Sequence, residues 1–323
     1  MYKKIGSVGL GFLMFFSGLI AQGVQAETGK GHKYETVQPV GGVLTSVGSD
    51  PMVYLISFWA VEFKRLYPKV VFGVEQAGSS TAPPALLSGE ANLAPMSRPM
   101  KEKEIAAFEA KYGYLPTEIR VALDTLAVYV NHKNPLAGLT FAQVDAVFSS
   151  TRRCGQAADI TRWDELGLSA EWAGQKINLY GRNLLSGTRS FFAENALCKG
   201  DYKRSLQMKS TSTEVVSAVS AQLHAIGYSG VSYQRPGVRV LPLSRKAGEP
   251  FVEATPENAY SGRYPLTRFL YLYVNKAPQR PLPALEHEFV RFVLSAQGQA
   301  IVENDGFIPL SAELMKAELA KLE

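Results

Sequence analysis

Three short turns rich in Gly and Ser each follow a predicted strand and lead into a predicted helix. They read Ser46-Val47-Gly48-Ser49-Asp50-Pro51, Gly78-Ser79-Ser80-Thr81 and Arg182-Asn183-Leu184-Leu185-Ser186-Gly187-Thr188. Helix N-termini offer unpaired N–H groups and a partial positive charge, which suits an anion. Gly lets the backbone approach such a ligand, and Ser and Thr hydroxyls add donors. Each turn alone is also typical of a simple helix cap, but the set of three favours a binding site for a small anion.

The charged residues of these turns each have two interpretations. Arg182 stands four residues before Ser186-Gly187-Thr188 and can hold two oxygens of an oxyanion in a fork geometry that Lys lacks. Its alternative role is a surface ion pair, which contributes little to stability. Asp50 can cap a helix in which Pro51 occupies the first turn, where a missing N–H costs nothing.

A fourth segment, Pro95-Met96-Ser97-Arg98-Pro99-Met100, also follows an apolar, strand-like run. Ser97 and Arg98 would add a hydroxyl and a second positive group to the same site. The alternative is an ordinary turn with Arg98 exposed to solvent, because Ser and Pro are common in turns.

Alternating strands and helices position these turns. The predicted strands cover residues 43–45, 70–75, 119–130 and 270–274, and the predicted helices cover 51–66, 85–89, 101–112, 189–197, 283–304 and 311–322. Apolar residues recur at helical spacing in the first helix, and β-branched residues fill the strands. The pattern predicts an α/β fold with mixed sheets flanked by helices.

The two long strands at 119–130 and 270–274 divide the chain. We interpret them as crossings between a discontinuous first lobe and an inserted second lobe. The predicted first lobe covers 27–124 and 265–323, and the predicted second lobe covers 125–264. About 300 residues are enough for two lobes of ordinary domain size.

The N-terminus indicates secretion. Lys3 and Lys4 precede an apolar run, and Val24-Gln25-Ala26 follows as a small-residue cleavage site. That order is typical of a signal peptide, predicted here over residues 1–26, although an uncleaved anchor has the same general pattern. In an oxidising compartment, the only two cysteines, Cys154 and Cys198, favour one disulfide over two free thiols.

Charge and residue spacing argue against several other functions. Loss of Lys3 and Lys4 would lower the formal charge from +5 to +3, and no Lys/Arg cluster with interleaved aromatics indicates nucleic acid. The four His residues are scattered without metal-ligand spacing, so no metal and no cofactor is predicted. A secreted phosphatase with Ser80 or Ser186 as nucleophile lacks a His base beside either serine in the sequence.

At these residues the sequence resembles the periplasmic phosphate-binding component of phosphate ABC transporters. The resemblance runs from Thr45 to Leu310 and is most specific at Arg182 with Ser186-Gly187-Thr188. Further markers are Gly48-Ser49-Asp50, Gly78-Ser79-Ser80, Met96-Ser97-Arg98-Pro99-Met100, Ala225-Ile226-Gly227-Tyr228-Ser229-Gly230, Tyr264-Pro265-Leu266 and Asp305-Gly306-Phe307-Ile308-Pro309-Leu310. The resemblance implies a two-lobed type II periplasmic-binding fold with the ligand cleft between the lobes.

The resemblance also implies which residues bind the ligand. It assigns second-lobe contacts to Arg182, Ser186, Gly187 and Thr188, and first-lobe contacts to Ser49, Asp50 and Ser80. The family commonly has a ligand-binding Thr in the first loop, where this chain has Pro51 after Asp50. Some members have an Asp at the position of Ser97 that accepts the proton of the ligand. Asp50 either replaces that acceptor or only caps its helix.

The expected function is therefore capture of inorganic phosphate in the periplasm for an ABC transporter permease in the inner membrane. The expected protein is a monomer and not an enzyme. Phosphate carries a proton at neutral pH that sulfate lacks, so a buried acceptor separates the two anions strongly. The alternatives are another tetrahedral oxyanion of the sulfate type, and a scavenger or sensor that uses the same pocket without a transporter.

Overall fold

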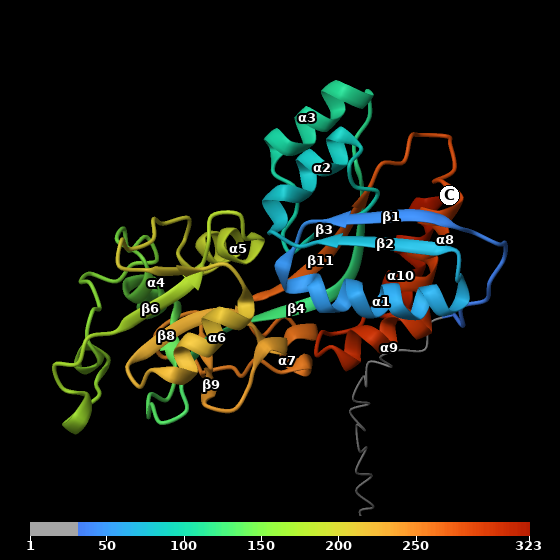
Figure 1. Ribbon diagram of the computed structural model, residues 1–323. Coiled ribbons are helices and arrows are strands. Elements are labelled where there is room, and N and C mark those ends of the chain that lie inside the picture. The colour runs from blue at the N-terminus through green and yellow to red at the C-terminus, as the bar shows by residue number, and fades with distance from the viewer. Residues whose placement is uncertain (1–31) are drawn as a thin grey trace, which may run out of the picture.

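The computed structural model describes residues 32–323, so the predicted signal peptide over 1–26 lies outside the described residues. Helices and strands alternate along the chain from β1 to α10 (Figure 1). Within the described part, no helix is both long and apolar enough to cross a membrane.

Eleven strands form the sheets of the described chain. They are β1 Gly42–Val47, β2 Val70–Glu75, β3 Ala94–Met96, β4 Thr117–Asn131, β5 Leu139–Thr140, β6 Asn178–Arg182, β7 Gln207–Lys209, β8 Ala225–Gly230, β9 Val238–Leu241, β10 Leu243–Ser244 and β11 Thr267–Val274. The largest sheet has the order β3-β11-β4-β8-β6-β7, and β9 also pairs with β4. Parallel pairs join β1 to β2 and β6 to β7 and β8, whereas β4 pairs antiparallel with β8, β9 and β11.

Helices cover these sheets. They are α1 Val53–Leu66, α2 Ala82–Ser88, α3 Glu102–Tyr112, α4 Phe141–Phe148, α5 Gly187–Ala196, α6 Ser212–Ala221, α7 Pro256–Tyr260, α8 Ala284–Val293, α9 Ala296–Asn304 and α10 Ala312–Leu319. Short 3-10 helices precede α1 (Asp50–Met52) and α2 (Ser79–Thr81).

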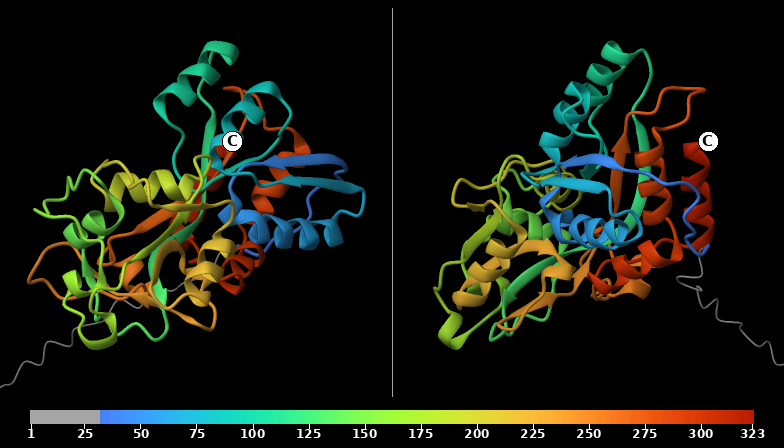
Figure 2. Two further views of the ribbon diagram at one scale, coloured as in Figure 1. Left: turned by 60° about the vertical axis from the view of Figure 1, so that its left-hand side comes forward. Right: turned by 45° about the vertical axis from the view of Figure 1, so that its right-hand side comes forward.

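Strand β4 belongs to both halves of the molecule. Its residues from Thr117 to Thr125 pair with β11, and its residues from Leu126 to Val130 pair with β8. The change of partner lies between Thr125 and Leu126. Figure 1 shows β4 running between the elements around α1 and those around α6, and both views of Figure 2 keep these two groups side by side.

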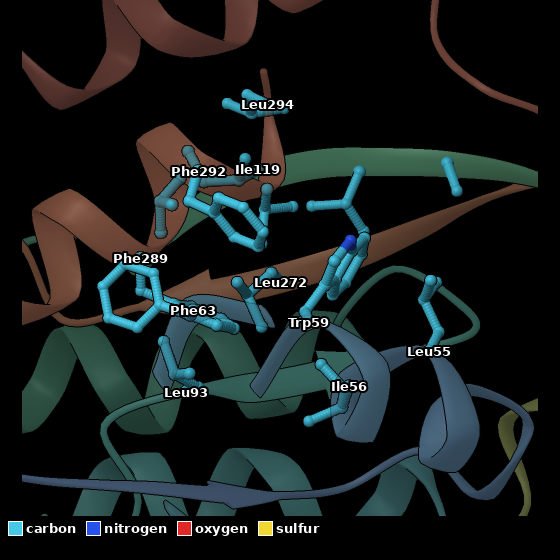
Figure 3. Close-up of a cluster of buried hydrophobic side chains, with 14 of the residues drawn as sticks. Leu55, Ile56, Trp59, Phe63, Leu93, Ile119, Leu272, Phe289, Phe292 and Leu294 are labelled. Carbon is cyan, nitrogen blue, oxygen red and sulfur yellow. The ribbon is translucent and has the colours of Figure 1, made fainter. Parts of the chain in front are cut away.

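Two separate hydrophobic cores define what we call the first and second lobes. In the first lobe, Trp59 and Phe63 of α1 belong to one buried cluster with Phe289 and Phe292 of α8. Apolar side chains of β4 and β11 complete this cluster (Figure 3). In the second, Trp163 and other buried side chains pack around the far half of β4. Because each core is apolar and closed on itself, the polar turns are left between them.

The predicted strands and most predicted helices are confirmed to within a few residues. One prediction is wrong: the helix over 283–304 is two helices, α8 and α9, which are separated at Leu294 and Ser295. Ser295 is the N-cap of α9 and its side chain accepts a hydrogen bond from the Gly298 amide, which starts a new helix axis there. The lobe boundaries 27–124, 125–264 and 265–323 stay a prediction.

The two cysteines form the predicted disulfide. Cys154 and Cys198 are bonded, with their Cα atoms 5.5 Å apart, and no cysteine of the described chain is free. The bond ties the loop after α4 to the end of α5. It therefore anchors the helix whose other end carries Ser186-Gly187-Thr188.

Candidate functional site

The turns of the first lobe are held together by backbone hydrogen bonds. The Gly48 amide donates to Glu75 O at 2.9 Å, the Gly78 amide to Gly48 O at 2.7 Å, and the Ser49 amide to Pro95 O at 2.8 Å. A Cβ at Gly48 would lie 2.2 Å from Pro95 O, so only glycine allows this approach. The first, second and fourth segments predicted from the sequence are thus brought into one cluster.

The second-lobe turn faces this cluster closely. Ser186 is the N-cap of α5, and its side chain accepts a hydrogen bond from the Arg189 amide. The following amides, of Gly187 and Thr188, are at the start of the helix, where no intrahelical acceptor exists. A Cβ at Gly187 would lie only 2.2 Å from Ser79 Oγ and 2.7 Å from Ser97 Oγ. The N-terminus of α5 therefore meets the first lobe at this point.

Arg182 and Asp50 form a buried ion pair between the lobes. Arg182 Nη1 lies 2.8 Å from Asp50 Oδ2, and the Arg182 side chain has no exposed surface. Ser212, the first residue of α6, donates to Asp50 Oδ2 from its amide at 3.1 Å and from its hydroxyl at 3.0 Å. Arg182 also donates to Ser212 Oγ at 2.7 Å and to Ser210 O at 2.7 Å. The interpretation of Arg182 as a member of a surface ion pair is wrong, because both side chains are buried.

Arg98 is buried, so the interpretation of an exposed turn residue is wrong. It forms two hydrogen bonds with Glu104 of α3, at 2.7 and 2.8 Å, and donates to Pro99 O. Burial raises the pKa of Glu104, but hydrogen bonds from Arg98 and the Lys101 amide outweigh it and lower that pKa. The guanidinium still reaches Ser80 Oγ at 3.4 Å. The carboxylate of Glu104 thus holds Arg98 at the edge of the turn cluster.

The serines of the first lobe differ in their surroundings. Ser79 is fully buried, and its hydroxyl lies 3.1 Å from Ser97 Oγ and accepts from the Ser97 amide at 3.0 Å. Ser80 is only partly buried, and its amide donates a hydrogen bond to Leu185 O of the second lobe at 3.0 Å. Ser49 is fully buried, with a hydroxyl that has no partner among the described residues. Ser79, rather than the predicted Ser80, lies against Gly187.

Sequence reasoning missed a second buried ion pair. Arg268 of β11 donates to Asp124 Oδ2 of β4 from Nε at 2.9 Å and from Nη2 at 2.7 Å. The same Nη2 donates to Thr188 Oγ1 at 2.9 Å. Burial lowers the pKa of Arg268, Asp124 opposes that shift, and nearby Arg182 adds to it. The signal in the sequence was a charged residue, Asp124 or Arg268, within each of two strands whose residues are mostly apolar.

Tyr233 closes the same region from the second lobe. Its hydroxyl donates to Pro51 O at 3.1 Å, and burial, followed by the charge of Asp50, raises its pKa well above the usual value. The phenol therefore stays neutral and remains a donor.

Several buried donors of this region have no partner among residues 32–323. Among them are Ser49 Oγ, Arg182 Nε, Ser229 Oγ and Arg268 Nη1. Buried polar groups are normally hydrogen-bonded, so a cluster of unpaired donors is typical of a site that binds an acceptor-rich ligand. Together with the free amides of α5, they suit a small oxyanion. Within the same residues, no group of His, Cys, Asp and Glu side chains could hold a metal ion.

Comparison with known proteins places the chain in a family. Residues 28–297 match the family described as PBP superfamily domain. The chain is 50% identical over 290 residues to the phosphate-binding protein PstS of Pseudomonas aeruginosa. The aligned region covers 90% of each chain. The chain belongs to the PstS family of phosphate-binding proteins. Because this is a family of binding proteins, membership confirms the prediction of a binding protein over the phosphatase alternative.

Solved structures agree with this family. One from Clostridium perfringens, described as a substrate-binding protein of a phosphate ABC transporter with bound phosphate, is 26% identical, with a TM-score of 0.69 over 83% of this chain and 100% of that one. An ABC-type phosphate transport receptor from Vibrio cholerae, 21% identical, shares the fold with a TM-score of 0.64 over 83% of this chain and 100% of that one. The predicted α/β periplasmic-binding-protein fold is confirmed.

Proposed function

We propose that this chain captures inorganic phosphate outside the cytoplasm and delivers it to an ABC transporter. The observation that carries the proposal is the 50% identity, over 90% of the chain, to a protein named as the phosphate-binding protein PstS. The Clostridium perfringens relative, described with bound phosphate, supports the same ligand.

The turn cluster supplies the contacts for phosphate in this proposal. The Gly187 and Thr188 amides and the Thr188 hydroxyl bind from the second lobe, together with Arg182 Nε. Ser49 and Ser79 donate from the first lobe, and Ser97 supports Ser79. Ser80 and Arg98 act at the edge of the cluster, and Ser186 caps the helix that presents the amides. A ligand held by groups from both lobes stabilises the closed arrangement over the open one.

Asp50 accepts the ligand proton in this proposal. Its Oδ2 accepts hydrogen bonds from both donors of Ser212 and forms the ion pair with Arg182. Its Oδ1 accepts no hydrogen bond from any described residue, so it is the oxygen left for a protonated ligand. A carboxylate that meets an unprotonated oxyanion is left without a donor, which disfavours sulfate. Asp50 thus replaces the proton-accepting Asp that some family members have at the position of Ser97.

Delivery follows from lobe closure in this proposal. The closed form docks on a permease in the inner membrane, and the protein works in the periplasm as a monomer without nucleic acid or cofactor. The disulfide between Cys154 and Cys198 supports an oxidising compartment. A scavenger or sensor would use the same pocket and differs only in lacking the permease.

Calorimetric titration of ligand-stripped protein with phosphate and then with sulfate tests the proposal. We expect tight phosphate binding, weak or absent sulfate binding, and loss of phosphate binding in Arg182→Ala. Arg263→Ala, which removes an exposed arginine, is the matched control and should bind as the wild type does. Preference for sulfate would move the ligand to the alternative oxyanion, and no binding of either anion would overturn the proposal.

A further inference from the structure

Arg268 is a buried guanidinium that the family resemblance did not assign to the site. Its side chain is 2% exposed, and its partner Asp124 is 1% exposed. The two residues are direct cross-strand neighbours on β11 and β4, one residue before β4 changes its partner from β11 to β8. Arg268 therefore stands where the first lobe meets the second.

The Arg268 side chain turns toward the second lobe. Its guanidinium carbon lies 5.4 Å from the centre of the Phe191 ring in α5. Its Nη2 donates to Thr188 Oγ1, in the first turn of the same helix. Because that hydroxyl oxygen already accepts a hydrogen bond from arginine, its own hydrogen is free to be donated elsewhere.

The planar shape of the guanidinium fixes where its last donors point. Nε and one N–H of Nη2 lie on one side of the plane and are used by Asp124 Oδ2. The other N–H of Nη2 lies on the end of the group and is used by Thr188. The end of a guanidinium carries two parallel N–H bonds, one from each Nη atom. An N–H of Nη1 is therefore parallel to the bond toward Thr188, and Nη1 is buried without a partner among the described residues.

We propose that Arg268 is a second ligand-binding arginine, which donates from Nη1 to the phosphate oxygen that also accepts from the Thr188 hydroxyl. The inference rests on the proposed function, because it requires the anion to lie at the N-terminus of α5. It adds a first-lobe cation to the second-lobe Arg182, so that each lobe holds the ligand with one guanidinium. Asp124 positions Arg268 and balances its charge.

Phosphate affinities of Arg268→Lys, Arg182→Ala and Arg120→Lys provide the test. Lys keeps a positive charge for Asp124 but has no planar fork. We expect Arg268→Lys to raise the Kd for phosphate about tenfold to hundredfold, as a lost hydrogen bond to a charged group implies. Arg120 is the matched control, since it also lies on the shared sheet, pairs with the buried Glu318 and lies over an aromatic ring, that of Phe269. Arg120→Lys should leave the Kd within about twofold.

A Thr188→Val background separates direct contact from an effect through Thr188. We expect Arg268→Lys to weaken phosphate binding there as well. If its effect disappears in that background, or if Arg268→Lys binds as the wild type does, the direct contact is refuted while the proposed function stands. Absence of phosphate binding in the wild type would instead refute the proposed function.

A crystal structure of the wild-type protein with phosphate decides the question if Arg268→Lys does not fold. A phosphate oxygen within about 3.2 Å of Arg268 Nη1 would support the proposal. A separation that leaves no hydrogen bond between these atoms would overturn it.

Discussion

Replacing Gly187 by Ala should weaken ligand capture without harming the fold. The added Cβ would lie 2.2 Å from Ser79 Oγ and 2.7 Å from Ser97 Oγ, both on the opposite lobe. Gly187 is the first residue of α5, and its backbone is not in the left-handed region, so alanine fits the helix itself. The clash exists only when the lobes are in contact, and opening the cleft removes it.

The size of the effect follows from the overlap. Rotation of the Ser79 hydroxyl does not remove the overlap, because the new Cβ would also lie 2.8 Å from Ser79 Cβ. Overpacking of this kind costs about 1–3 kcal/mol and occasionally more. If the whole cost destabilises the closed state alone, the Kd for phosphate rises about fivefold to more than hundredfold. At a phosphate concentration of 100 times the wild-type Kd, ligand stabilises the wild type by about 2.7 kcal/mol, and a hundredfold weaker variant gains only about 0.4 kcal/mol.

Calorimetric titration and thermal unfolding with and without phosphate measure both quantities. Gly73→Ala is the control, because a Cβ at Gly73 meets only Thr45 atoms at 3.8 Å. We expect the control to bind as the wild type does and Gly187→Ala to unfold normally without phosphate. Wild-type affinity in Gly187→Ala would refute the idea that phosphate binding needs α5 this close to Ser79 and Ser97.

Three further predictions concern other parts of the molecule. Ser79→Ala should weaken phosphate binding about threefold to tenfold by calorimetry, whereas Ser80→Ala should change it less, because Ser79 is fully buried and Ser80 is only partly buried. Removing the disulfide with Cys154→Ser and Cys198→Ser should lower the free energy of unfolding in urea by about 4 kcal/mol, since the sequence separation is 44 residues; an unchanged urea midpoint would contradict this. Burial raises the pKa of Asp305 from 3.8 to about 6, so the folded state holds that proton more tightly than the unfolded state. The stability of the wild type relative to Asp305→Asn should therefore fall between about pH 4 and pH 6 and stay level above that range; equal pH profiles would show that the shift is absent.

The sequence predicts the turns and four of the eleven strands, β1, β2, β4 and β11, because these have strong local signals, whereas β3 and β5 to β10 were not given ranges. The strand over 70–75 agrees with β2 residue for residue. Ser186-Gly187-Thr188 was expected at a helix N-terminus, and it is the start of α5. The break between α8 and α9 was not predicted, because apolar residues continue through Leu294 at a spacing that suits one long helix.

The partners of charged residues could not be predicted, because they come from distant parts of the chain. Asp50 meets Arg182 across 132 positions of sequence, and Arg268 meets Asp124 across 144. Asp124 is a charged residue within a mostly apolar strand, but nothing in its local sequence identifies Arg268 as its partner. The choice between Ser79 and Ser80 depends on the turn of a single 3-10 helix, which sequence pattern does not resolve.

The pairing of each cleft arginine with its own carboxylate has a consequence for the conditions in which the protein works. Arg182 is balanced by Asp50, and Arg268 by Asp124. An incoming dianion therefore meets a site with little net charge, and its attraction comes from N–H and O–H groups within hydrogen-bond distance. Dissolved ions screen long-range fields between exposed charges but hardly reach contacts inside a closed cleft. We expect the Kd for phosphate to be nearly the same at high and at low ionic strength. A change in external salinity would then leave phosphate capture almost unchanged.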